Sequence, residues 1–270
     1  MRELRFATIE GGSVKPFPGA VVQQADESTA FDVSWPLVAW DEDAPVQDGG
    51  LAARGVVRVQ LLPDGKPRAV SPDGSDAEGP KLWPRKGGGY FLAWLAQRQE
   101  VDDAGWRLEG TGDLRAFRWV ELLTLDDKGE PASAVRRVSP ERGHAVAFDL
   151  AETDRGLVVV VQDEAAPTEG AGSRLVRYLV DADRAIASDL VDASLGPALA
   201  DIAPSGDGGF LFWKDDADHA FLAPWTPAAE TAGPPTAEAA LDGARVLAAS
   251  GEGQIYAAIG SELRRLSCAR

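Results

Sequence analysis

A short motif recurs along this chain and constrains its fold more than any other feature. Each copy is a glycine-rich turn, an apolar run carrying aromatic residues, and then an acidic turn. The clearest copies cover residues 87–94 and 208–216, and looser copies cover residues 35–43, 155–164 and 251–259. Repetition at this spacing is typical of arrays or rings of small sheets. The sequence therefore predicts an all-β repeat protein.

A second kind of segment follows each copy of the motif. In residues 56–62, Val57, Val59 and Leu61 alternate with polar residues, which is the pattern of a strand with one wet face. The motif itself is apolar almost without alternation, as in residues 157–161, which favours a strand buried on both faces. We interpret the motif as the innermost strand of a β-propeller blade and the second segment as an outer strand.

The two ends of the chain complement each other. Residues 4–12 have the pattern of an outer strand and its turn with no inner strand before them, whereas residues 245–259 have the pattern of an inner strand. We therefore expect a single domain, a propeller of five blades of four antiparallel strands, closed by the N-terminal strand joining the C-terminal blade. The expected blades are residues 31–79, 80–142, 143–198, 199–243, and 244–270 completed by 1–30. A fragment of a longer ring or array is the competing interpretation.

The motif also resembles a known group of proteins. The Gly-Gly-aromatic-aliphatic-Trp strand at residues 88–94, alternating with turns such as residues 126–129, resembles the repeats of bacterial β-propeller proteins. Residues 181–184 depart from that pattern because they lack the glycine, and residues 253–259 lack the tryptophan. The resemblance implies a propeller fold and carries no activity.

The charge balance limits the partners. The 270 residues carry a formal net charge of −16, which repels phosphate backbones and anionic membrane surfaces, so we expect neither nucleic-acid binding nor membrane insertion. The single cysteine, Cys268, excludes an intrachain disulfide. The start of the chain lacks the apolar core of a signal peptide, so we expect a cytoplasmic protein, or an extracellular or periplasmic one if Met1 is not the native start.

Carboxylates cluster after three of the motif strands. The candidate metal ligands are Asp41, Asp43, Asp163, Glu164, Asp215 and Asp216. Equivalent turns of a propeller lie on one face of the ring, where several carboxylates could hold Ca²⁺, which takes about 6–8 oxygen ligands. The alternative is that these are ordinary solvated turns, in which aspartate is favoured. No other cofactor is indicated.

Two further sets of residues are candidates for a site. Asp32, Asp149 and Asp201 come just before motif strands and are the best-placed carboxylates for a glycan hydrolase working in the central channel, which needs two acids. Trp83, Trp106 and Trp225 fall in expected turns or loops, where an indole can stack on a sugar or a cation. We expect the other tryptophans to pack between blades.

The sequence favours non-enzymatic binding: a scaffold that presents variable loops to a protein or glycan partner. The loops at residues 97–114, 165–172 and 224–241 are the expected contact surfaces. A channel-sited glycan hydrolase and a structural repeat module of a larger assembly are the alternatives.

Overall fold

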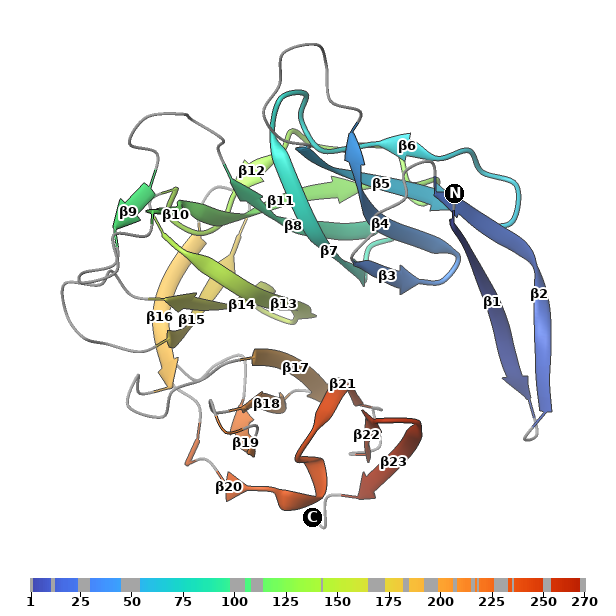
Figure 1. Ribbon diagram of the computed structural model, residues 1–270. Coiled ribbons are helices and arrows are strands. Elements are labelled where there is room, and N and C mark those ends of the chain that lie inside the picture. The colour runs from blue at the N-terminus through green and yellow to red at the C-terminus, as the bar shows by residue number, and fades with distance from the viewer. Residues whose placement is uncertain are drawn as a thin grey trace. The chain divides into compact units, whose positions relative to one another are not determined.

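The computed structural model describes residues 2–10, 13–23, 30–44, 54–97, 105–107, 114–141, 143–164, 173–181, 185–191, 199–205, 208–214, 217, 219–225, 233–234, 236–249 and 254–267. These residues form strands with one short 3₁₀ helix, which confirms the predicted all-β class (Figure 1). No helix in these ranges is long and apolar enough to cross a membrane. The chain divides into two compact units, Met1–Ala104 with Val120–Arg137, and Gly105–Trp119 with Val138–Arg270.

The first unit holds a hairpin and two four-stranded antiparallel sheets, in the orders β3-β4-β5-β6 and β7-β8-β11-β12. The strands are β1 (Arg2–Glu10), β2 (Ser13–Gln23), β3 (Phe31–Ser34), β4 (Leu37–Ala44), β5 (Arg54–Leu61), β6 (Arg68–Ala69), β7 (Asp76–Pro84), β8 (Tyr90–Gln97), β11 (Arg118–Leu125, whose first two residues group with the second unit) and β12 (Arg136–Arg137). Strand β7 packs against β3, β4 and β5 of the preceding sheet.

The second unit holds two four-stranded sheets, in the orders β13-β14-β15-β16 and β17-β18-β19-β20, a three-stranded sheet β21-β22-β23, and the small pair β9-β10. The elements are β9 (Gly105–Arg107), β10 (Leu114–Ala116), β13 (Ala145–Thr153), β14 (Gly156–Glu164), β15 (Ser173–Val180), β16 (Ala185–Val191), β17 (Leu199–Ser205), β18 (Gly208–Lys214), β19 (Ala220–Trp225), β20 (Thr236–Ala237), η3 (Ala239–Leu241), β21 (Ala244–Ala249), β22 (Gln254–Ile259) and β23 (Glu262–Ser267). β17 packs against β13 and β14, and also against β21.

The repeated motif forms the second strand of every large sheet, as β4, β8, β14, β18 and β22. The sequence predicted that the motif is the innermost strand of each blade, which would lie at one edge of its sheet. This prediction is wrong, because the motif strand has a neighbour on both sides. The residues at 157–161 are buried, as predicted. Their burial does not require an edge position, because an interior strand between packed sheets is equally enclosed.

The N-terminal hairpin is a sheet of its own among the described strands. β1 pairs with β2, with Leu4 opposite Val21, and β23 pairs with β22, with Leu263 opposite Ala258. The predicted pairing of the N-terminal strand with the C-terminal sheet is therefore not shown, and closure of a ring stays a prediction. Within the first unit, Phe6 and Phe17 of the hairpin pack against a core of Val38, Trp40 and Leu62.

Candidate functional site

The three aspartates predicted for a hydrolase occupy one repeated position. Each lies in the first strand of its sheet and pairs with a motif-strand residue that directly precedes Trp40, Val161 or Trp213, which we call the anchor residues of their strands. The pairs are Asp32 with Ala39, Asp149 with Val160, and Asp201 with Phe212, before Trp40, Val161 and Trp213. In β7 the same position holds Lys81, opposite Ala93. The sequence placed these aspartates before the inner strands, whereas they lie within the first strands of their sheets; their catalytic role stays a prediction.

The carboxylate of Asp32 accepts backbone hydrogen bonds with both oxygens. Oδ1 accepts from the N–H of Val33 at 2.8 Å, and Oδ2 accepts from the N–H of Leu82 in β7 at 2.7 Å. Asp149 repeats the first of these contacts, because its Oδ1 accepts from the N–H of Leu150 at 2.9 Å. A general acid must present a protonated oxygen to the substrate, so the geometry of Asp32 suits a brace between strands better than a catalytic acid. The side chain of Asp201 lies outside the described residues.

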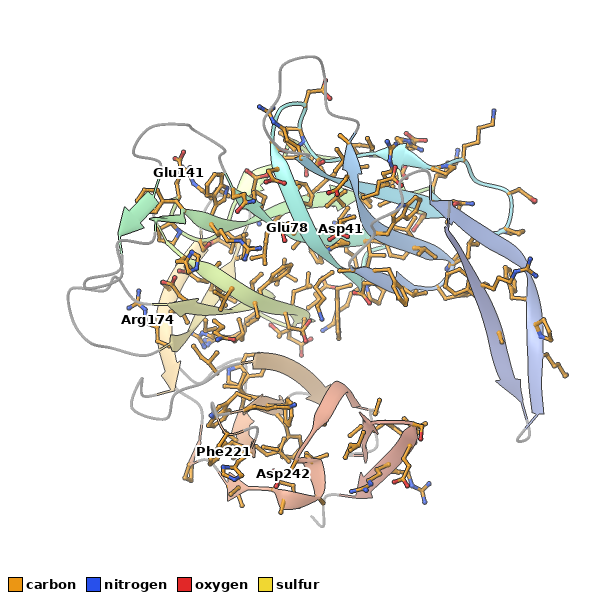
Figure 2. All side chains as sticks on the ribbon, viewed as in Figure 1. Asp41, Glu78, Glu141, Arg174, Phe221 and Asp242 are labelled. Atoms are coloured by element: carbon orange, nitrogen blue, oxygen red, sulfur yellow. The ribbon has the colours of Figure 1, made fainter. Side chains whose placement is uncertain are left out.

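Two buried aspartates connect the same two sheets. Asp41, only 3% exposed, accepts from the N–H of Ala30 at 3.0 Å and from the N–H of Gly79 in β7 at 2.7 Å (labelled in Figure 2). Asp76 of β7 accepts from the N–H of Gly55 in β5 at 2.7 Å and from the side-chain amide of Gln97. We call Asp32, Asp41 and Asp76 the inter-sheet aspartates. Their charge is compensated by amide donors, which is how an ionised group is held inside a protein.

A similar hydrogen bond recurs between consecutive sheets. Its donor is a backbone N–H at the start of the third strand of one sheet. Its acceptor belongs to a residue at, or just before, the start of the first strand of the next sheet. Gly55 donates to the Asp76 carboxylate at 2.7 Å, and Ala220 donates to the Asp242 carboxylate at 2.8 Å. At the start of β11, the N–H of Arg118 donates to the carbonyl oxygen of Gly143 at 3.0 Å. In both compact units, therefore, an aspartate carboxylate helps to hold consecutive sheets together.

The predicted metal ligands do not form a centre within the described residues. Asp163 of β14 accepts from the N–H of His144 at 2.9 Å with Oδ1, and its Oδ2 lies 3.3 Å from Nη2 of Arg174. Asp43 lies in β4 and is half-buried. Asp215, Asp216 and the side chain of Glu164 lie outside the described residues. In the described part of the chain, no group of three or more His, Cys, Asp or Glu residues could hold a metal ion.

The predicted binding tryptophans lie in strands rather than in loops. Trp83 is in β7 and half-buried, Trp106 is in β9 with its side chain outside the described residues, and Trp225 is in β19 at 3% exposure. Trp225 cannot stack on a surface ligand from that position. It was misplaced because prolines around residues 224–235 suggested a loop, whereas the proline at 224 is accommodated at an exposed site in the strand.

A different tryptophan, Trp35, is exposed to solvent, although the sequence predicted that it packs between blades. Trp35 is 52% exposed and Phe31 is 55% exposed, and the Trp35 ring meets the Phe17 ring edge-on, with centroids 4.4 Å apart. The signal that could have found Trp35 is its position: it precedes a proline in the turn between β3 and β4, not in the motif strand.

The buried anchor tryptophans differ in how their indole N–H is satisfied. Trp40 donates to Glu42 at 3.2 Å, and Trp94 donates to Glu121 at 3.1 Å. Trp213 is fully buried with no hydrogen-bond acceptor in the described part of the chain, and its ring stacks on Phe221 at 5.6 Å between centroids. The stacked Phe221 ring contributes packing to Trp213 and does not accept its indole N–H.

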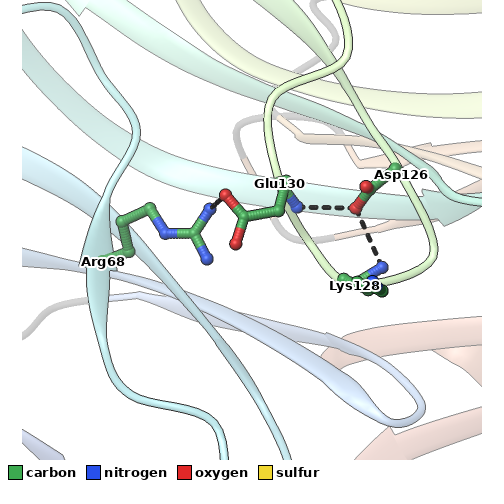
Figure 3. Close-up of polar contacts among 4 residues, drawn as sticks. All are labelled: Arg68, Asp126, Lys128 and Glu130. Atoms are coloured by element: carbon green, nitrogen blue, oxygen red, sulfur yellow. Dashed lines mark hydrogen bonds and ion pairs between the residues drawn. The ribbon is translucent and has the colours of Figure 1, made fainter.

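Acidic residues of the β11–β12 turn accept backbone hydrogen bonds and form an ion pair. Asp126 Oδ1 accepts from the N–H groups of Lys128 at 2.9 Å and Glu130 at 2.8 Å, and Glu130 forms an ion pair with Arg68 (Figure 3). Asp127 accepts from the N–H of Gly89 at 2.5 Å. Burial, together with the negative charge of Asp127, raises the pKa of Tyr90 above its ordinary value of 10.0.

No protein-family model matches the chain, and no curated protein matches its sequence. Among solved structures, the chain is similar to a protein of unknown function from Dyadobacter fermentans, with a TM-score of 0.57 and 12% identity over 84% of this chain and 73% of that one. It also aligns with an acylaminoacyl peptidase from Pyrococcus horikoshii, with a TM-score of 0.38, 11% identity and coverage of 90% of this chain but 46% of the peptidase. The first likeness concerns the fold alone, and the second is too low to carry an argument.

Proposed function

We propose that this protein is a non-catalytic binding module: a rigid β scaffold that presents its surface to a protein or glycan partner. The observation that carries the proposal is the use of two candidate acids, Asp32 and Asp41. Both oxygens of each accept backbone N–H groups, so these two carboxylates are engaged in holding sheets together. A net charge of −16 favours a neutral or basic partner over nucleic acid.

We further propose that the sheets are the blades of a closed five-bladed propeller. First strands pack against one another from sheet to sheet, β3 with β7, β13 with β17, and β17 with β21, which is the arrangement of strands around a propeller axis. Among the described residues the last sheet has three strands, and its outer strand carries Leu263 at 71% exposure. An edge of the N-terminal hairpin would complete that sheet. Closure removes exposed edges, which otherwise invite aggregation.

The alternative function is glycan hydrolysis in the channel. The observation in its favour is the shared register of Asp32, Asp149 and Asp201, which would bring three carboxylates to one level of a closed ring. Two of these carboxyl groups could serve as the catalytic pair of a glycosidase if both pointed into the channel at the required separation. The hydrogen bonds of Asp32 count against its participation.

A glycan array read in two ways separates the two functions. The full chain is labelled and applied to the array, and each glycan is also incubated with it and analysed for new reducing ends. We expect no hydrolysis of any glycan, with or without binding. Hydrolysis that is lost in Asp149→Asn or Asp201→Asn, with an unchanged melting temperature, would contradict the proposal and establish the enzyme.

A further inference from the structure

The outer strands of the four-stranded sheets differ sharply in length. β6 (Arg68–Ala69), β12 (Arg136–Arg137) and β20 (Thr236–Ala237) have two residues each, and two of the three carry arginine. β16 (Ala185–Val191) has seven residues. An outer strand presents a row of N–H and C=O groups that can pair with another chain, and proteins protect such edges by keeping them short or charged. β16 departs from the protection seen in the other three sheets.

β16 is the last strand of its sheet among the described residues. It pairs with β15 on one side, from Val180 opposite Ala185 to Leu175 opposite Val191, with one irregularity near Leu175. Ile186 is 43% exposed, and Ala187 beside it is also exposed. The strand contains no lysine, arginine or proline, residues that often guard an edge, and its one charged residue is Asp189. Among its described side chains, that of Ile186 is large, apolar and exposed.

The outer strand of the last sheet provides a contrast. β23 has six residues, but Arg264 and Arg265 stand in it, and both are exposed. Arginine disfavours pairing at an edge where its charge would lose water, so such an edge needs a partner that leaves the guanidinium groups solvated. In the proposed ring the N-terminal hairpin takes the edge of β23, which leaves β16 as the long described outer strand of the second unit without an assigned partner.

We propose that the outer edge of β16 binds an extended peptide by strand addition. The backbone of the peptide would complete the ladder, and alternate side chains would set specificity. The exposed Ile186 calls for an apolar residue in the neighbouring register. The net charge of −16 favours a basic residue elsewhere in the peptide. The inference rests on the proposed function, since it names the partner of the binding module as a protein segment.

A phage-displayed library of random dodecapeptides, selected on the full chain, is the probe. Peptides that enrich are synthesised and their Kd is measured by fluorescence anisotropy. We expect Ile186→Lys, which places a charged guard at the edge, to raise the Kd at least tenfold. The matched control Ala69→Lys, at the exposed edge of β6, should change it less than twofold. Both variants should melt within a few degrees of the parent, because each site is at the surface.

Backbone methylation then separates strand addition from a simple apolar contact. N-methylating one alternate set of peptide residues should abolish binding, and methylating the other set should not, because only one set faces β16. The proposal is overturned if no peptide enriches, if enriched peptides bind Ile186→Lys equally, or if both methylated sets bind. It is also overturned if the chain is a dimer that Ile186→Lys dissociates, since a second copy would then occupy the edge. These results leave the hydrolysis assay, and with it the proposed function, untouched.

Discussion

Replacing Asp41 by alanine is expected to lower the free energy of unfolding of the first compact unit by about 3–5 kcal/mol. The carboxylate accepts two backbone N–H groups, from Ala30 at 3.0 Å and from Gly79 at 2.7 Å, in an environment where the side chain is 3% exposed. Each hydrogen bond to a charged group contributes about 1.5–3 kcal/mol, and removing the acceptor leaves two donors without one. Urea unfolding, monitored by tryptophan fluorescence, measures the change.

Two further variants sharpen this test. Asp41→Asn retains one oxygen acceptor and should show about half the loss, because its amide group meets the second donor with a donor of its own. Asp64→Ala, in an exposed turn of the same unit, should change stability by less than about 0.5 kcal/mol. If excess Ca²⁺ raised the melting temperature of the parent protein but not that of Asp41→Ala, Asp41 would be a metal ligand and the structural role would be wrong.

Gly89→Ala is expected to cost about 3 kcal/mol or more. Gly89 has φ +74°, and a Cβ added there would lie 2.2 Å from the carbonyl oxygen of Leu125, a backbone atom that cannot move by itself. The left-handed conformation alone costs an alanine about 1–2 kcal/mol, and the remainder comes from displacing the β11–β12 turn. The same urea titration measures this loss.

Gly74→Ala is the matched control for that prediction. Gly74 also has a positive φ, +81°, and the one atom near its added Cβ is the flexible Nη1 of Arg54 at 3.4 Å. Its cost should therefore stay near 1–2 kcal/mol, about that of the backbone conformation alone. Equal losses for Gly74→Ala and Gly89→Ala would show that the close approach of the two turns does not contribute.

The sequence predicted the sheets better than it predicted the site. Period-two alternation at residues 57–61 and unbroken apolarity at 157–161 report burial directly, so the strands and the all-β class could be found. Whether a strand lies second or first in its sheet depends on pairing with distant residues, to which local pattern is blind. For that reason the sequence placed the motif in the first strand of each sheet, at its inner edge, whereas it forms the second strand.

The roles of the acids were hidden for the same reason. The sequence placed Asp41 in a turn after its strand, whereas it lies within β4 and one of its partners is an N–H 38 residues away, at Gly79. Asp76 likewise depends on a contact with Gly55, 21 residues back along the chain. An aspartate that braces two sheets and one that awaits a ligand look alike in sequence, because both require a carboxylate near a strand end. Only the positions of the donors distinguish them.

Hydrogen exchange of β23, resolved to single residues, tests most directly the claim that the sheets form a closed ring. Alternate amides of Glu262–Ser267 face β22, and the others face away from it. In a closed ring the outward amides pair with the N-terminal hairpin, so we expect them to exchange on the order of a hundredfold more slowly than open amides. Deleting residues 1–23 should return only this outward set to fast exchange. Fast exchange of the outward amides in the full chain would contradict closure.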